Sequence, residues 1–152
     1  MEIKASSFFT MEQQIQVRNA IKEAEHETSG EIRVHIETNL SGNVLDRAAW
    51  MFNRIGMHKT KNRNGVLFYL AVQKKEFAII GDGGINSKVE KNFWDKIKNI
   101  LQEHFRKGTY TEGLIEGILM AGMQLKEHFP YQKDDKNELP DEISFDDNRL
   151  PE

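Results

Sequence analysis

The segment "VLFYLAV" at residues 66–72 constrains the fold of this 152-residue chain most strongly. It is continuously apolar and rich in β-branched and aromatic residues, which is typical of a strand covered on both faces. It is far shorter than the roughly 18 apolar residues that would span a bilayer. The segment therefore predicts a central strand with helices packed above and below it.

Two further segments predict strands beside it. "EIRVHIE" at 31–37 alternates apolar and polar residues with period two, as a strand does. "FAII" at 77–80 follows the short reversal "QKKE", so that 66–80 forms a hairpin. A crossover from 31–37 to 66–72 makes those two strands parallel, and the hairpin makes the third antiparallel.

Helical patterns surround the strands. Capping-box pairs, Thr10 with Gln13, Ser87 with Glu90 and Thr109 with Glu112, predict three helix starts. The expected helices cover 10–27, 44–55, 87–107 and 109–128. The order predicts an α/β fold, a three-layer α/β/α sandwich with a small mixed, Rossmann-like sheet.

Three glycines interrupt the last of these helices, at Gly113, Gly117 and Gly122. Glycine costs up to about 1 kcal/mol relative to alanine inside a helix. We therefore expect the backbone of this helix to lie close against another element.

The charge distribution divides the chain into a domain, 1–130, and an acidic tail, 131–152. The tail holds eight acidic and three basic residues, which leaves 16 acidic and 18 basic residues in the domain. No dense basic surface is present, so nucleic acid is not an expected partner. The tail lacks apolar periodicity, and we expect it to be disordered.

The composition also bears on compartment and chemistry. The absence of cysteine excludes disulfides, thiolate zinc sites and cysteine nucleophiles. The first residues lack the pattern of a secretory signal, and no segment is long and apolar enough to span a membrane. These features predict a cytoplasmic protein without a membrane span.

The predicted topology brings three loops, 28–31, 58–65 and 81–86, to one rim of the sheet. The parallel strands begin there, and the antiparallel third strand ends there. The side-chain oxygens of these loops are of the kind that Ca²⁺ or Mg²⁺ prefers. The candidate metal ligands are Asp82, Glu31, Asn64, Asn62 and Asn86.

The sequence "GDGG" at 81–84 has more than one explanation. As a phosphate cradle it lacks the Lys-Ser/Thr pair of a P-loop and the G-x-G-x-x-G spacing of a dinucleotide site. As turn chemistry it is well suited, since Asp82 can accept bonds from nearby amides. As one wall of a metal site, it would need further ligands from the loops 28–31 and 58–65. His58 lies in the rim loop, and we expect it to be a surface residue.

The order of several motifs resembles the TPM domain family, which includes thylakoid-lumen acid-phosphatase-like proteins. The motifs are "SGEIRVHI", "AAWMFNRIGMHKTKNRNGVLFYLAVQKKEFAIIGDGGIN" and "FRKGTYTEGLIEGI", and the resemblance runs from about Thr10 to Pro130. It implies an α/β/α sandwich with a site at the rim, matched here by Glu31, Asn64 and Asp82. It also implies divalent metal binding and a weak acid phosphatase activity. Many members carry Asp where this chain has Arg63, which would repel a metal unless its side chain points away.

We therefore predict a non-catalytic module whose bound divalent cation, Ca²⁺ or Mg²⁺, orders the three loops. One alternative is a metal-assisted phosphatase, in which Glu31 or Asp82 holds the ion. Another is a protein-interaction module without catalysis, in which the acidic tail or the rim contacts a protein partner.

Overall fold

Four strands form the central sheet of the computed structural model, which describes residues 3–131 and 143–145. The strands are β1 (Glu31–Glu37), β2 (Gly65–Ala71), β3 (Glu76–Gly81) and β4 (Ile143–Phe145), in the spatial order β3-β2-β1-β4. β1 is parallel to β2 and β4, and β3 is antiparallel to β2. The predicted mixed sheet and hairpin are confirmed.

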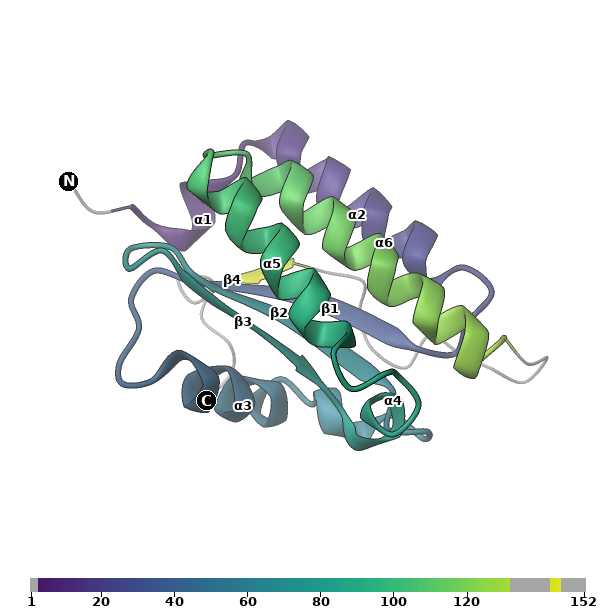
Figure 1. The fold of residues 1–152 in the computed structure, drawn as a ribbon. Helices are drawn as coiled ribbons and strands as arrows, with labels where there is room; N and C mark the ends of the chain where they lie inside the picture. The colour runs from purple at the N-terminus through teal and green to yellow at the C-terminus, as the bar shows by residue number, and fades with distance from the viewer. Residues whose placement is uncertain (1–2, 132–142, 146–152) are drawn as a thin grey trace.

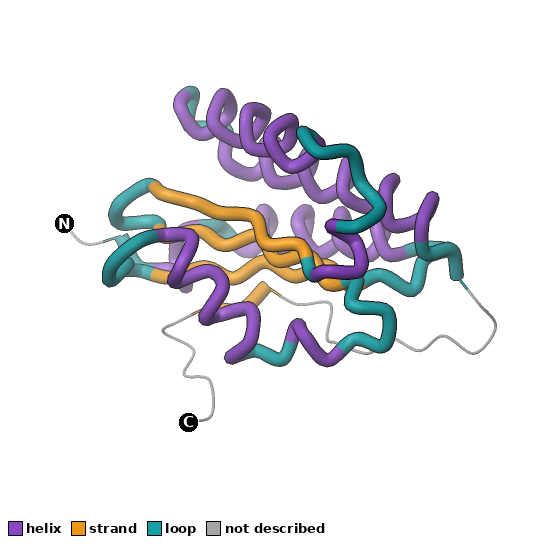
Figure 2. The backbone as a smooth tube through the Cα atoms, turned by 60° about the horizontal axis from the view of Figure 1, so that its bottom comes forward, coloured by secondary structure: helices purple, strands orange, loops and turns teal. Residues whose placement is uncertain are grey.

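Helices cover both faces of this sheet. They are α1 (Ala5–Phe8), α2 (Met11–Glu25), α3 (Val44–Arg54), the 3-10 turn η1 (Met57–Lys59), α4 (Gly83–Asn86), α5 (Phe93–Arg106) and α6 (Tyr110–His128). The helices α2, α5 and α6 lie on one side of the sheet and α3 on the other (Figure 1). The strands form a layer between the two helical layers (Figure 2), as expected of the three-layer sandwich. Among the described residues, no helix is long and apolar enough to cross a membrane.

The alternation of side chains along the strands divides the core into two parts. Ile32, Val34 and Ile36 of β1 pack in the larger cluster with α2, α5 and α6. Leu67 and Tyr69 of β2 pack in the smaller cluster with α3. All seven residues of β2 are buried, which explains why its sequence is continuously apolar.

One of the three predicted capping boxes forms. The Thr10 side chain accepts from the Gln13 amide, and the Gln13 side chain accepts from the Thr10 amide. The prediction at Ser87 is wrong, because its hydroxyl donates to the Gly84 carbonyl at 2.9 Å and the long helix begins later, at Phe93. The Thr109 hydroxyl donates to the His104 carbonyl at 3.1 Å instead of capping α6.

Part of the acidic tail differs from its prediction. We expected residues 131–152 to be disordered, but residues 143–145 add β4 to the edge of β1. Ile143 and Phe145 are buried in the core, and the Ser144 hydroxyl lies 2.6 Å from Nδ1 of His35. The other tail residues, apart from Tyr131, lie outside the described part of the chain. All three residues are buried, and the apolar-polar-apolar pattern of three positions is too short to predict a strand from sequence.

The glycines of α6 lie where another element approaches its backbone, as predicted. A Cβ on Gly122 would lie 2.6 Å from Cβ and 2.7 Å from Cα of Ala24 on α2. A Cβ on Gly113 would lie 2.7 Å from Cβ of His104 on α5. The absent side chains let α6 pack closely against both neighbouring helices.

We predict that Gly122→Ala destabilises the protein by about 1–3 kcal/mol, because overpacking against the α2 backbone outweighs the gain in helix propensity. The free energy of unfolding in urea measures the effect. Met123→Ala is the matched control, since Met123 is 69% exposed on the same helix and should change stability by less than about 0.5 kcal/mol. A more stable Gly122→Ala variant would contradict the packing argument.

Candidate functional site

Three loops meet at the rim of the sheet beside α4 (Figure 1). The register pairs Glu31 with Gly65 across β1 and β2, and Val66 with Gly81 across β2 and β3. The Glu31 amide donates to the Asn64 carbonyl at 3.3 Å, and the Asp82 amide donates to the Gly65 carbonyl at 2.9 Å. The predicted juxtaposition of the three loops is therefore confirmed.

Asp82 is 7% exposed and bonded on both carboxylate oxygens. Its Oδ1 accepts from the Gly83 amide at 2.7 Å and thereby caps α4. Arg63 forms a bidentate ion pair with Asp82, with Nε 2.8 Å from Oδ2 and Nη2 2.9 Å from Oδ1. Burial raises the pKa of Asp82, but the hydrogen bonds from Arg63 and the Gly83 amide outweigh burial and hold this pKa below its usual value. The carboxylate is therefore ionised and paired with a cation of the protein itself.

Close backbone contact explains the glycine at position 84. A Cβ there would lie 2.0 Å from the Asn62 carbonyl oxygen and 2.5 Å from that of Arg63. The Ile85 amide donates to the Arg63 carbonyl at 3.2 Å, and Arg63 has a positive φ of 52°. This contact accounts for Gly84 and the cap of α4 accounts for Asp82, whereas Gly83 has open space around it and no positive φ that would require glycine.

Asn64 is held at the centre of the rim. The residue is 1% exposed. Its backbone amide donates to Thr60 Oγ1 at 3.1 Å, and its side-chain Nδ2 donates to Ser29 Oγ at 3.2 Å. Its Oδ1 is buried and has no hydrogen-bond partner among the described residues. Buried polar atoms in native structures are nearly always bonded, so this oxygen is an unusual feature of the rim.

His58 also has a buried polar atom without a hydrogen-bond partner among the described residues, although the sequence analysis predicted a surface residue. Its Nδ1 is buried and has no hydrogen-bond partner within the described part of the chain. Its charge also contributes to the lowered pKa of Asp82, after burial, Arg63 and the Gly83 amide. The position of His58 in the rim loop was the available sequence signal.

The other three predicted metal ligands, Asn86, Asn62 and Glu31, differ in burial and in hydrogen bonding. Asn86 is engaged at both ends, because its Nδ2 donates to the Gly81 carbonyl at 2.7 Å and its Oδ1 accepts from Trp94 Nε1 at 2.7 Å. Asn62 is exposed, with its backbone carbonyl against Gly84. Glu31 is 3% exposed at the start of β1. Asn86 therefore shapes the loop, whereas Glu31 adds a buried carboxylate to the rim.

Within residues 3–131 and 143–145, no group of three or more His, Asp or Glu side chains is arranged to hold a metal ion. A cation at the rim would need the Asn64 amide oxygen and backbone carbonyls in addition to the carboxylates. Ca²⁺ and Mg²⁺ accept such mixed oxygen ligands.

The family model of the TPM domain matches residues 3–124. The chain belongs to the TPM domain family. No curated protein matches it.

Three solved structures resemble this TPM domain. The BA42 protein of the psychrophilic bacterium Bizionia argentinensis is 47% identical, with a TM-score of 0.83 over 90% of this chain and 94% of that one. The N-terminal domain of a P. gingivalis protein is 21% identical, with a TM-score of 0.66 over 84% of each chain. The N-terminal domain of the cg2496 protein of Corynebacterium glutamicum is 12% identical, with a TM-score of 0.63 over 79% of this chain and 76% of that one. The last two show the fold alone.

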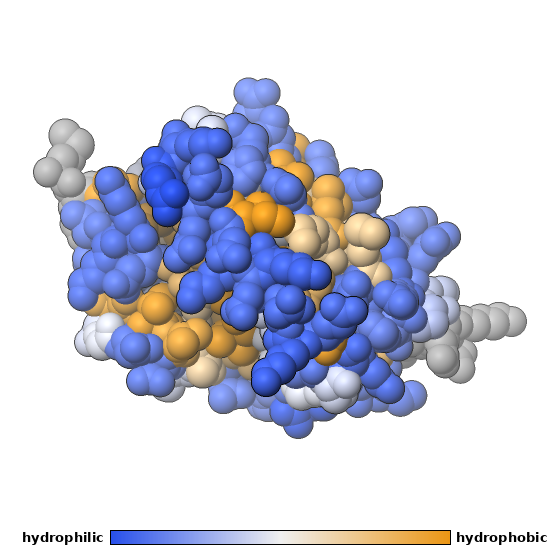
Figure 3. Space-filling view, viewed as in Figure 1, coloured by the Kyte–Doolittle hydropathy of each residue, from blue (hydrophilic) through white to orange (hydrophobic). Residues whose placement is uncertain are grey.

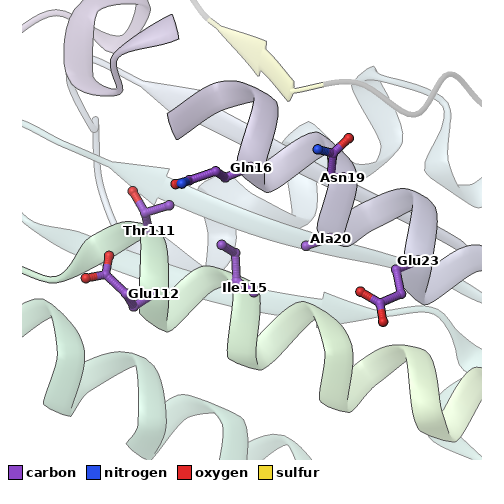
Figure 4. Close-up of a pocket in the computed structure, with 7 residues that line it drawn as sticks. All are labelled: Gln16, Asn19, Ala20, Glu23, Thr111, Glu112 and Ile115. Atoms are coloured by element: carbon purple, nitrogen blue, oxygen red, sulfur yellow. The ribbon is translucent and has the colours of Figure 1, made fainter. Parts of the chain in front are cut away.

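The TPM domain also has a groove between α2 and α6, with a volume of about 570 Å³. Figure 4 shows Glu23 and Glu112 at opposite ends of this groove, on different helices. The two carboxylates do not converge, so the groove offers no shared acidic site.

A buried polar cluster occupies the other end of β1. Glu37 is 4% exposed and accepts from Arg47, with Nε 2.7 Å from Oε1 and Nη2 2.9 Å from Oε2. The Tyr69 hydroxyl donates to Oε1 at 2.5 Å, and Nε2 of His35 lies 3.9 Å from Oε2. Arg47 also stacks over Trp50, with its guanidinium carbon 4.4 Å from the ring centroid. The cluster ties α3 to β1 and β2.

Hydrogen bonding in this cluster controls the protonation of Glu37. Burial raises the pKa of Glu37, but the hydrogen bonds from Arg47 and Tyr69, together with the nearby His35 ring, outweigh it and lower the pKa from 4.5 to about 2. Because the folded pKa is depressed, the stabilisation is fully present above pH 4.5 and is lost as the pH falls toward about 2.

We predict that Glu37→Gln removes about 2–3 kcal/mol of stability at neutral pH and flattens the loss of stability between pH 4.5 and 2.5. Urea unfolding at a series of pH values measures both effects. The exposed Glu12→Gln on α2 is the control and should keep the acid sensitivity of the wild type. An unchanged pH dependence in Glu37→Gln would show that Glu37 does not titrate as described.

Proposed function

We propose that this TPM domain binds a divalent cation, Ca²⁺ or Mg²⁺, at the rim formed by the loops at 28–31, 58–65 and 81–86. Three hard oxygen donors support the proposal: the buried carboxylates of Glu31 and Asp82, and the side-chain oxygen of Asn64. Their loops are joined by backbone hydrogen bonds, so an ion bound to any of them would stiffen all three.

The observation that carries the proposal is the buried, unbonded Oδ1 of Asn64. An acceptor left in this state costs about 1–3 kcal/mol. A cation coordinated by this oxygen would remove that cost. Because Nδ2 of the same amide is held by Ser29, the oxygen is fixed in orientation and available as a ligand.

Arg63 limits the affinity of such a site. Its guanidinium occupies the Asp82 carboxylate, so a metal ion that uses Asp82 must displace it. The Arg63 side chain is 59% exposed, whereas that of Asp82 is 6% exposed, so loss of the guanidinium alone would leave a buried carboxylate unpaired. A cation that takes the place of Arg63 would compensate the charge of Asp82, at an affinity reduced by the competition.

We predict that Ca²⁺ or Mg²⁺ shifts the backbone amide NMR signals of residues 28–31, 58–65 and 81–86 in the full-length chain. Asp82→Asn should weaken binding about tenfold or more, because it removes a charged ligand but keeps an oxygen that can cap α4. Asp95→Asn, at an exposed position on α5, is the matched control and should bind like the wild type. No shift in these loops at millimolar ion would contradict the proposal.

We further predict that Arg63→Gln raises the cation affinity about fivefold, since it removes both the competing ion pair and the repulsion of the metal. Arg106→Gln on α5 makes the same charge change away from the rim and should leave the affinity unchanged. Isothermal titration calorimetry of the three proteins measures the difference. Equal affinities for Arg63→Gln and the wild type would show that the ion does not use Asp82.

A further inference from the structure

We propose that the open edge of β3, with the groove beside it, binds an extended acidic segment of a partner protein. The proposal is independent of cation binding, because this surface lies at the opposite end of β3 from the rim. It rests on an unpaired strand edge, an aromatic floor and an excess of positive charge.

The open edge supplies the backbone groups for such binding. β3 pairs with β2 along one side, and no described strand lies along its other side. Phe77, Ile79 and Ile80 are half-buried along it. Figure 3 shows apolar surface between β3 and α3, with hydrophilic side chains around it. An unpaired edge strand of this kind can accept an added strand from another chain.

A groove of about 440 Å³ opens beside the start of β3. Its floor is a row of aromatic rings, with Phe77 and Phe105 at 5.1 Å and Phe105 and Tyr110 at 4.8 Å between ring centroids. The floor can hold an apolar side chain of a segment laid along β3. Residues from β3, α5 and α6 therefore contribute to one surface.

Charge at the groove selects an acidic occupant. Lys75, Lys98 and Arg106 line it, against the single carboxylate of Glu76. Arg106 pairs with Glu103 at 3.2 Å, and that pair is exposed. Complementary charge at the margin of an interface steers association and specifies the partner.

The other edge of the same sheet shows which segment fits. There β4 supplies Ile143 and Phe145 to the core with Ser144 between them, and the sequence places Asp141 and Glu142 before it and Asp146 and Asp147 after it. The chain thus already carries a short strand on one sheet edge, and its sequence has acidic pairs on both sides of that strand. A partner segment with this pattern would meet the basic margin of the groove at the β3 edge.

The test uses a fluorescein-labelled peptide with the sequence of residues 139–149, "LPDEISFDDNR", and the full-length chain. We expect a saturable rise in fluorescence anisotropy that weakens with added salt. Lys98→Glu should weaken binding about fivefold, by replacing an attraction with a repulsion. Lys96→Glu is the control, because Lys96 lies on the same helix, is exposed and does not line the groove.

Amide NMR shifts locate the peptide. Shifts at residues 76–80 support the proposal, whereas shifts confined to Val34–Ile36 would mean that the peptide exchanges with β4 and would overturn it. Equal binding to Lys98→Glu and the wild type would also overturn it. So would a failure to bind the peptide together with Lys98-dependent binding of a labelled oligothymidylate, which would assign the groove to nucleic acid.

Discussion

The pairing register of β1, β2 and β3 is the constraint on which the molecule depends. It places Glu31 opposite Gly65 and Gly81 opposite Val66, so the ends of three separate segments lie at one rim. A slip by one residue would turn the apolar residues of β1 away from α2, α5 and α6. Because β2 is buried on both faces, the hydrophobic core fixes the register, and the register positions every polar group at the rim.

Two buried carboxylates, one at each end of the sheet, each form a bidentate ion pair with an arginine. Glu37 is held by Arg47, which is 32% exposed, and also by Tyr69. Asp82 is held by Arg63, which is 59% exposed. The inner cluster is tied into the packing of α3, whereas the rim pair can open into solvent. This difference in exposure makes the first pair part of the packed interior, whereas the arginine of the second pair faces solvent.

The sequence predicted the parts that depend on periodicity and chain direction. The alternation in "EIRVHIE" and the apolar run "VLFYLAV" identified their strands, and a crossover followed by a hairpin brought Glu31, Asn64 and Asp82 to one rim. The start of α5 was wrong, because the Ser87 hydroxyl bonds back to Gly84 and leaves the helix to begin at Phe93. Local capping patterns do not show which partner a hydroxyl will find.

The sequence by itself determined the sandwich, the strand directions and the meeting of the three loops, because each follows from hydrophobic pattern and connection length. The tertiary structure alone decided that Arg63 pairs with Asp82, that Oδ1 of Asn64 is buried without a partner, and that Ile143–Phe145 returns to β1. These features depend on side-chain direction and on contacts between distant segments. Neither side-chain direction nor long-range contact produces a periodic pattern in the sequence.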